Sequence, residues 1–163
     1  MRSNQRSASS PRTLAAGSSG SPDWKYLSAR RLSLFVTASI ERGTRWMVFD
    51  QHDDPSWDRA RQQVESFLDG LDQQGAFAGS TPQESYFVIC DERVNAPRTV
   101  AEGKVKVLFG IAITKPSDFH AWLITHTASG STCRPTWPNR LTTSSRRVEW
   151  EIETAILRGV LID

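Results

Sequence analysis

The spacing of apolar residues predicts two helices in the first half of the chain. From Ser28, a residue suited to cap a helix, apolar side chains recur at helical spacing as far as Gly43. A longer apolar stripe with a polar opposite side follows Asp54-Pro55 and ends at Gly75. A capping residue before a proline in the first turn is a typical helix start. Each predicted helix therefore has one side to bury.

Short apolar runs predict the strands of a sheet. Residues 45–50 and 86–90 are apolar on both sides of the chain, which is typical of strands buried on both faces. Residues 104–113 alternate cleanly, and a turn at 115–118 leads into 119–127, so these two strands should form an antiparallel hairpin. The predicted order is α-β-α-β-β-β. This is an α+β fold in which two helices cover a mixed, mainly antiparallel sheet.

The two ends of the chain differ in composition from its centre. Residues 1–22 are rich in Ser, Gly, Arg and Pro, which predicts a flexible, disordered leader. The ordered domain is expected over 23–127. Residues 128–163 form an unassigned tail, loop-like at first, with apolar spacing over 148–158 that would suit a short helix.

Composition and charge narrow the class of protein. With 20 Lys+Arg against 18 Asp+Glu the net charge is only +2, which argues against a nucleic-acid-binding protein. A hydrophobic content of 38% is enough to build a core. No apolar run approaches the ~20 residues that cross a bilayer, so membrane insertion is not expected. Cys90 and Cys133 show no paired spacing, and we expect reduced thiols.

Carboxylates gather after two of the predicted strands. Asp50 and Asp54 follow the first strand and Asp91 follows the second, an arrangement that could hold Mg²⁺ for phosphoryl transfer. Asp54 is equally explained as a helix cap, and no glycine-rich phosphate loop accompanies it. His120 and His126 are about 20 Å apart along one strand, too far to share a zinc ion. We therefore predict no cofactor, metal site or catalytic residue, with a magnesium-dependent enzyme as the alternative.

Several stretches in series resemble the C-terminal domain of contractile phage tail sheath proteins. The similar region covers about residues 24–127, and Arg12-Thr13-Leu14 is similar to a segment that precedes this domain in the family. The stretches that carry the resemblance are WKYLSARRLSLFVTASIERGTRWMVFD, WDRARQQVESFL, GAFAGSTPQESYFVICDE and GKVKVLFGIAITKPSDF.

The resemblance implies a structural, non-enzymatic role. Sheath subunits polymerise as a helical tube around an inner tail tube and contract to drive that tube through the host envelope. The implied partners are other sheath subunits and the inner tube protein, and the implied location is a virion tail assembled in the bacterial host cytoplasm. A phage, a prophage or a bacterial contractile injection system would fit. The family's N-terminal and outer domains have no counterpart here, so we expect a fragment of a sheath subunit or an adaptor that caps sheath assembly.

Two sets of residues are expected to make contacts between proteins. An unpaired strand edge is a template for another chain, so strand 119–126 is the candidate edge between subunits. Its candidate contact residues are Phe119, Ala121, Trp122, Leu123 and Ile124. The candidate contacts to an acidic inner tube are Arg30, Arg31, Lys104 and Lys106.

Overall fold

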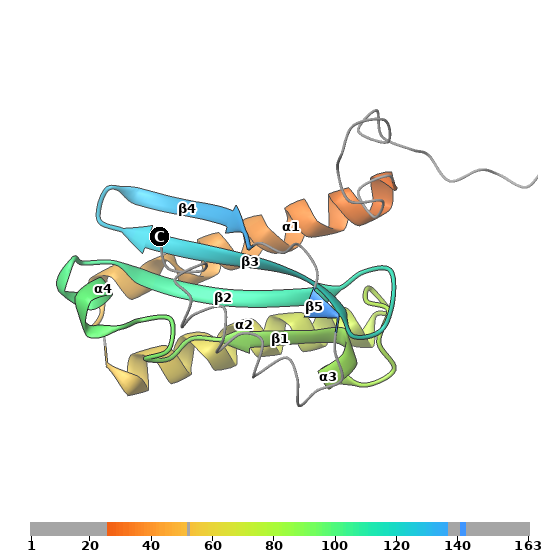
Figure 1. The fold of residues 1–163 in the computed structure, drawn as a ribbon, viewed down its shortest axis with the longest axis horizontal. Coiled ribbons are helices and arrows are strands. Elements are labelled where there is room, and N and C mark those ends of the chain that lie inside the picture. The colour runs from red at the N-terminus through yellow and green to blue at the C-terminus, as the bar shows by residue number, and fades with distance from the viewer. Residues whose placement is uncertain (1–25, 52, 137–140, 143–163) are drawn as a thin grey trace, which may run out of the picture.

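Two amphipathic helices lie against one face of an antiparallel sheet in the computed structural model of the chain, which describes residues 26–51, 53–136 and 141–142 (Figure 1). The strands are β1 (Tyr86–Ile89), β2 (Val105–Ala112), β3 (Asp118–Thr127), β4 (Gly130–Pro135) and β5 (Leu141–Thr142). Their order in the sheet is β1-β2-β3-β4, with β5 also paired to β3, and every pairing is antiparallel. The predicted α+β class is confirmed.

The long helices are α1 (Leu27–Thr44) and α2 (Asp54–Gln73). At the start of α2 the Asp53 side chain accepts a hydrogen bond from the Ser56 backbone N–H at 3.1 Å, and Pro55 stands in the first turn. The cap of α2 is therefore Asp53, one residue before the one predicted. The predicted Ser28 cap is wrong, because α1 begins at Leu27 and no side chain caps it. The short helices are η3 (Arg45–Phe49), α3 (Pro82–Ser85) and α4 (Pro97–Ala101).

Residues 45–50 do not form the predicted strand. They continue directly from α1 as the 3₁₀ helix η3, whose last turn closes with a 3.3 Å bond from the Asp50 backbone N–H to the Met47 carbonyl. Met47 is buried, whereas Phe49 is 85% exposed. A short apolar run carries no period that separates a strand from a tight helical turn, which is why the pattern misled.

The sheet continues beyond residue 127, where the sequence predicted a loop. A hairpin joins β3 to β4, with Thr127 opposite Gly130. The prediction that strand 119–126 is an edge is wrong, because β2 pairs with one side of β3 while β4 and β5 pair with the other. The correction applies to Phe119, Ala121, Trp122, Leu123 and Ile124. The predicted leader and the predicted helix at 148–158 lie outside the described residues.

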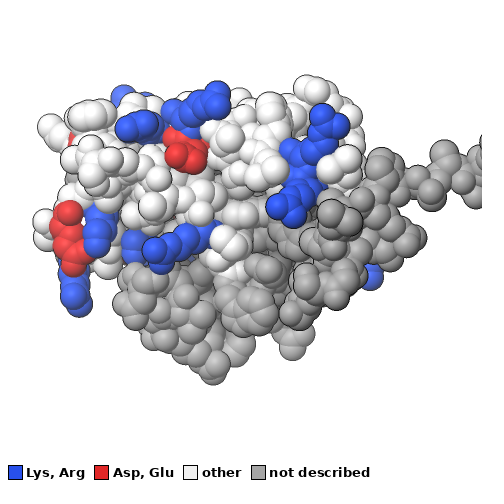
Figure 2. All heavy atoms as spheres, turned by 90° about the horizontal axis from the view of Figure 1, so that it is seen from above, with Lys and Arg blue, Asp and Glu red and all other residues white. Residues whose placement is uncertain are grey.

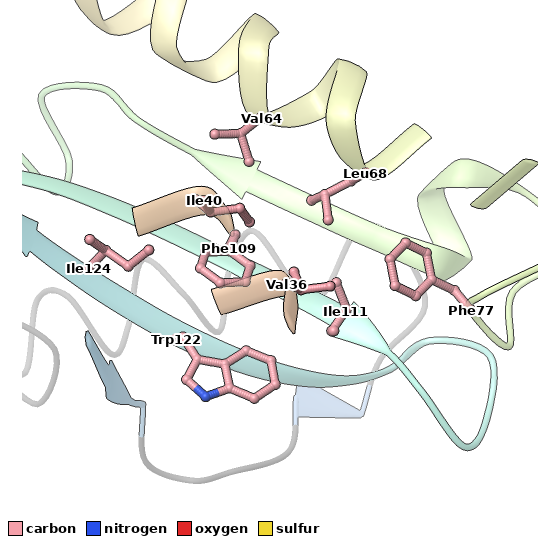
Figure 3. Close-up of a cluster of buried hydrophobic side chains, with 9 residues drawn as sticks. All are labelled: Val36, Ile40, Val64, Leu68, Phe77, Phe109, Ile111, Trp122 and Ile124. Atoms are coloured by element: carbon pink, nitrogen blue, oxygen red, sulfur yellow. The ribbon is translucent and has the colours of Figure 1, made fainter. Parts of the chain in front are cut away.

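The main core fills the space between the helices and the sheet (Figure 3). At its centre the ring of Phe109 on β2 stacks on that of Trp122 on β3, with centroids 5.7 Å apart. Full burial of one such side chain contributes about 1.5–3 kcal/mol. The cluster consists of Val36, Ile40, Val64, Leu68, Phe77, Phe109, Ile111, Trp122 and Ile124.

The alternation of side chains along β2 assigns them to two faces. Phe109 and Ile111 point toward the helices, whereas Leu108 and Ala112 belong to a second buried cluster on the opposite face. Every residue of β2 is buried, as expected for a central strand. Lys106 shares the parity of Leu108, so its side chain also belongs to the face away from the helices.

Candidate interaction surfaces

A pocket of about 570 Å³ lies on the face of the sheet opposite the helices. Its floor comes from alternate residues of three neighbouring strands: Lys106 is in register with Thr125, which is in register with Thr132. Residues of α4 and the turn after it provide one wall. The charged residues that line the pocket are Arg98, Lys104, Lys106, Arg134 and Glu102. Positive charges thus outnumber the single carboxylate, so the pocket suits an anionic group.

Asn95 holds the strand pairing together where β1 ends, through the backbone of the pocket residue Lys106. β1 stops at Ile89, opposite Leu108, and the chain then leaves the sheet. The buried Asn95 side chain takes the place of the missing strand residue opposite Lys106. Its Oδ1 accepts from the Lys106 backbone N–H at 2.7 Å, and its Nδ2 donates to the Lys106 carbonyl at 3.0 Å. The chain can therefore detour through α4 without leaving β2 unpaired.

Replacing this amide should be costly. We expect Asn95→Ala to lower the free energy of unfolding by about 2–3 kcal/mol. The Lys106 N–H loses its partner, and the Lys106 carbonyl keeps only the long contact from Cys90 Sγ at 3.8 Å. Urea denaturation measures the loss. The matched control is Arg98→Ala in the nearby helix α4, which removes an exposed ion pair with Glu102 and should cost less than about 0.5 kcal/mol. Equal losses in the two variants would contradict this account of Asn95.

The four predicted tube contacts do not form one surface. Arg30 and Arg31 are exposed on the first turns of α1, on the helix side of the sheet. Lys104 and Lys106 line the pocket on the other side, where Lys104 pairs with Glu102 at 2.7 Å. Lys106 is only 7% exposed. A single flat partner surface could meet one pair or the other, not both.

Figure 2 looks down on the molecule from the side that carries α1 and β4 in Figure 1. Blue, positively charged side chains recur across the described surface in this view, and red, acidic ones gather in fewer places. The described part of this side of the molecule therefore carries more positive than negative charge, although the whole chain has a net charge of only +2.

The structure does not bring the candidate magnesium ligands together. Asp50 accepts a hydrogen bond from Ser56 and is ion-paired with Arg59, while Asp91 pairs with Arg93 at 2.6 Å. Asp50 follows a 3₁₀ helix and not a strand end, so the premise of neighbouring strand ends is wrong. Across the described ranges, no three His, Cys, Asp or Glu residues are grouped so that they could hold a metal ion.

A buried histidine joins three elements, a role that the sequence did not predict. His126 on β3 is completely buried, with its Nε2 2.8 Å from Thr44 Oγ1 on α1 and its Nδ1 2.7 Å from Ser131 Oγ on β4. Burial, helped by the positive charge of Arg45, lowers the pKa of His126 from 6.5 to about 4. The ring is therefore neutral at pH 7, and one ring nitrogen can accept a hydrogen bond while the other donates.

Neither thiol has the character of a nucleophile. Burial, together with the negative charge of Asp91, raises the pKa of Cys90 to about 12. Burial and Glu41 raise that of Cys133 to about 11. Both cysteines are free, and at neutral pH both remain protonated thiols with little reactivity. Among the helices that the structure describes, none has the length and hydropathy to span a membrane.

Solved structures similar to this chain include two with about 30% sequence identity. One is a chain of the cryo-EM structure of the anti-feeding prophage (AFP) baseplate, with 30% identity and a TM-score of 0.55 over 59% of this chain and 27% of that one. The other belongs to the PVC sheath complex, an extracellular contractile injection system in its contracted state, with 29% identity and a TM-score of 0.54 over 60% and 28%. No family model and no curated protein matches the sequence.

Both neighbours are components of assembled complexes of contractile injection systems. The resemblance predicted from the sequence is therefore confirmed in part, because the neighbours are components of contractile injection systems. The particular sheath domain stays a prediction. The chain spans little more than a quarter of the length of either neighbour, 27% and 28%.

Proposed function

We propose that this chain is a structural subunit, or part of one, in a contractile tail sheath that polymerises around an inner tube and contracts. The observation that carries the proposal is its identity of 29–30% with chains of a sheath complex and a baseplate. In this proposal residues 26–136 act as the inner domain, which stands nearest the tube. In this proposal the sheath does mechanical work, which comes from the repacking of its subunits from an extended into a contracted lattice.

The two outer strands of the sheet support polymerisation. Within the described residues β1 and β4 are the ends of the strand order, and no strand pairs with their outer sides. Exposed strand edges can accept a strand of another chain. The proposed edge contact between subunits therefore moves from β3 to β4 and β1.

The basic pocket supports contact with an acidic tube. Of the two separated pairs of candidate residues, only Lys104 and Lys106 belong to a concave surface, where Arg98 and Arg134 add further positive charge. We assign the tube contact to this face. That leaves Arg30 and Arg31 for another partner.

The test is co-sedimentation of the chain with purified inner tube from a contractile injection system. We expect the parent to pellet with the tube and the double variant Lys104→Gln/Arg134→Gln to bind about fivefold more weakly, since each exposed charge contributes about 0.5 kcal/mol. Lys106 is left intact because it is buried. The matched control Arg30→Gln/Arg31→Gln removes the same charge from α1 and should bind like the parent. A parent that pellets neither with tube nor with sheath would refute the proposed function.

A further inference from the structure

The outward side of the first half of α1 mixes apolar and basic side chains. Leu34 is 60% exposed and Leu27 is 37% exposed. Arg30 and Arg31 lie between them in the sequence, and none of the ion pairs among the described residues involves either arginine. Exposed apolar side chains ringed by one sign of charge are typical of a contact surface. We call these four residues the basic flank.

The second half of α2 presents the opposite charge. Glu65, Asp69 and Asp72 follow the i, i+4, i+7 spacing of a single helix side. Their closeness is visible in the raised pKa of Tyr86, which burial and then the charges of these three carboxylates push upward. None of the ion pairs in the described part of the chain involves them. Like charges at this spacing destabilise a helix slightly, by about 0.2–0.5 kcal/mol per pair. We call them the acidic flank.

The two flanks lie on different helices of the layer and face in different directions. Gln63 marks the side of α2 that faces α1, since its Nε2 donates to the Gly43 carbonyl at 3.0 Å. The acidic flank is on the other side of α2, beside Tyr86 on β1. In Figure 1, α1 runs along β4 and α2 runs along β1. The basic flank therefore lies on α1 opposite the buried residues of that helix, and the acidic flank lies on the side of α2 that faces away from α1.

We propose that a second copy of this chain docks side by side with the first, with the acidic flank of one copy against the basic flank of the next. The two patches differ, so the contact is heterologous, and each copy keeps one free flank for a further copy. Such a contact propagates as an open row unless its rotation closes a ring. This inference rests on the proposed function and names one contact through which its subunits would polymerise.

Two complementary variants test the contact. Arg30→Gln/Arg31→Gln removes both charges of the basic flank, and Glu65→Gln/Asp69→Asn removes two of the three charges of the acidic flank. We expect the parent to show a mass that rises with concentration in light scattering at low salt, and each variant alone to associate roughly tenfold more weakly. An equimolar mixture should reach the mass of two chains and stop there, because it contains one intact pair of flanks.

The control is Lys115→Gln, which removes an exposed charge from the turn between β2 and β3 and belongs to neither flank. It should associate like the parent. Added salt should weaken parental association, because the two arginines are exposed and the carboxylates are only half-buried. A monomeric parent, variants that associate as well as the parent, or a mixture that stays monomeric would each overturn the contact. Tube binding is measured separately, so failure of this contact is distinguishable from failure of the proposed function.

Discussion

Truncation of Phe109 to alanine is expected to lower the free energy of unfolding by about 4 kcal/mol. The ring is completely buried in the middle of β2 and stacks on Trp122 with centroids 5.7 Å apart. The variant loses the transfer free energy of the ring and leaves a cavity between the sheet and the two helices, which can close only in part. The midpoint of urea denaturation, at an unchanged slope, measures the loss.

A matched phenylalanine provides the control. Phe49 ends η3 with 85% of its surface exposed, so Phe49→Ala should change the free energy of unfolding by less than about 0.5 kcal/mol. If Phe109→Ala cost no more than Phe49→Ala, the helices would not be packed on the sheet as described. The comparison thus tests the whole helix–sheet interface with one residue type.

Stability should also fall as the pH is lowered from 6.5 toward 4. The pKa of His126 is about 4 in the folded chain, against 6.5 for an ordinary histidine. Because the folded value is the lower one, the unfolded chain binds the proton first, and acid favours unfolding. The stabilisation is complete above about pH 6.5 and is lost as the pH falls through this window, by roughly 2–3 kcal/mol.

The variant His126→Gln isolates this contribution from that of the carboxylates, which also titrate in acid. It should be less stable than the parent at pH 7, where the bonds to Thr44 and Ser131 are lost or weakened. The difference between the two proteins should then shrink as the pH falls to 4. Urea denaturation at several pH values measures both curves. Parallel curves would mean that His126 takes up its proton equally well in both states.

The long periodic elements could be predicted from sequence, and the short ones could not. The stripe of α2 extends over many turns, and the alternation of β2 persists along its whole length, so each period is unambiguous. Residues 45–50 are too few to show a period. β4 was missed because its Ser, Thr, Gly and Pro content is typical of loops. Its position depends on pairing with β3, which local sequence does not encode.

The candidate surfaces could likewise be predicted only in part from the sequence. The alternation of β2 correctly placed Lys104 and Lys106 on one side of the sheet. The alternation does not predict the register of β2 with β3 and of β3 with β4. That register brings Thr125, Thr132 and Arg134 to the same pocket. Nor does it reveal that the amide of Asn95 replaces a strand residue. Charge counts along the chain likewise show near balance, whereas the folded helices separate the charges in space.

The order of the strands in the sheet, β1-β2-β3-β4, is also their order along the chain. Each of these four strands therefore pairs with its neighbour in sequence, and the loops that join β2 to β3 and β3 to β4 are short. Low sequence separation between partners favours fast folding, because little loop entropy is lost before contacts form. We expect the strands β2, β3 and β4 to fold early, starting from the hairpins that join them, on a timescale of roughly milliseconds. The surfaces that recognise other copies would then form only after each chain has folded, which limits premature aggregation during synthesis.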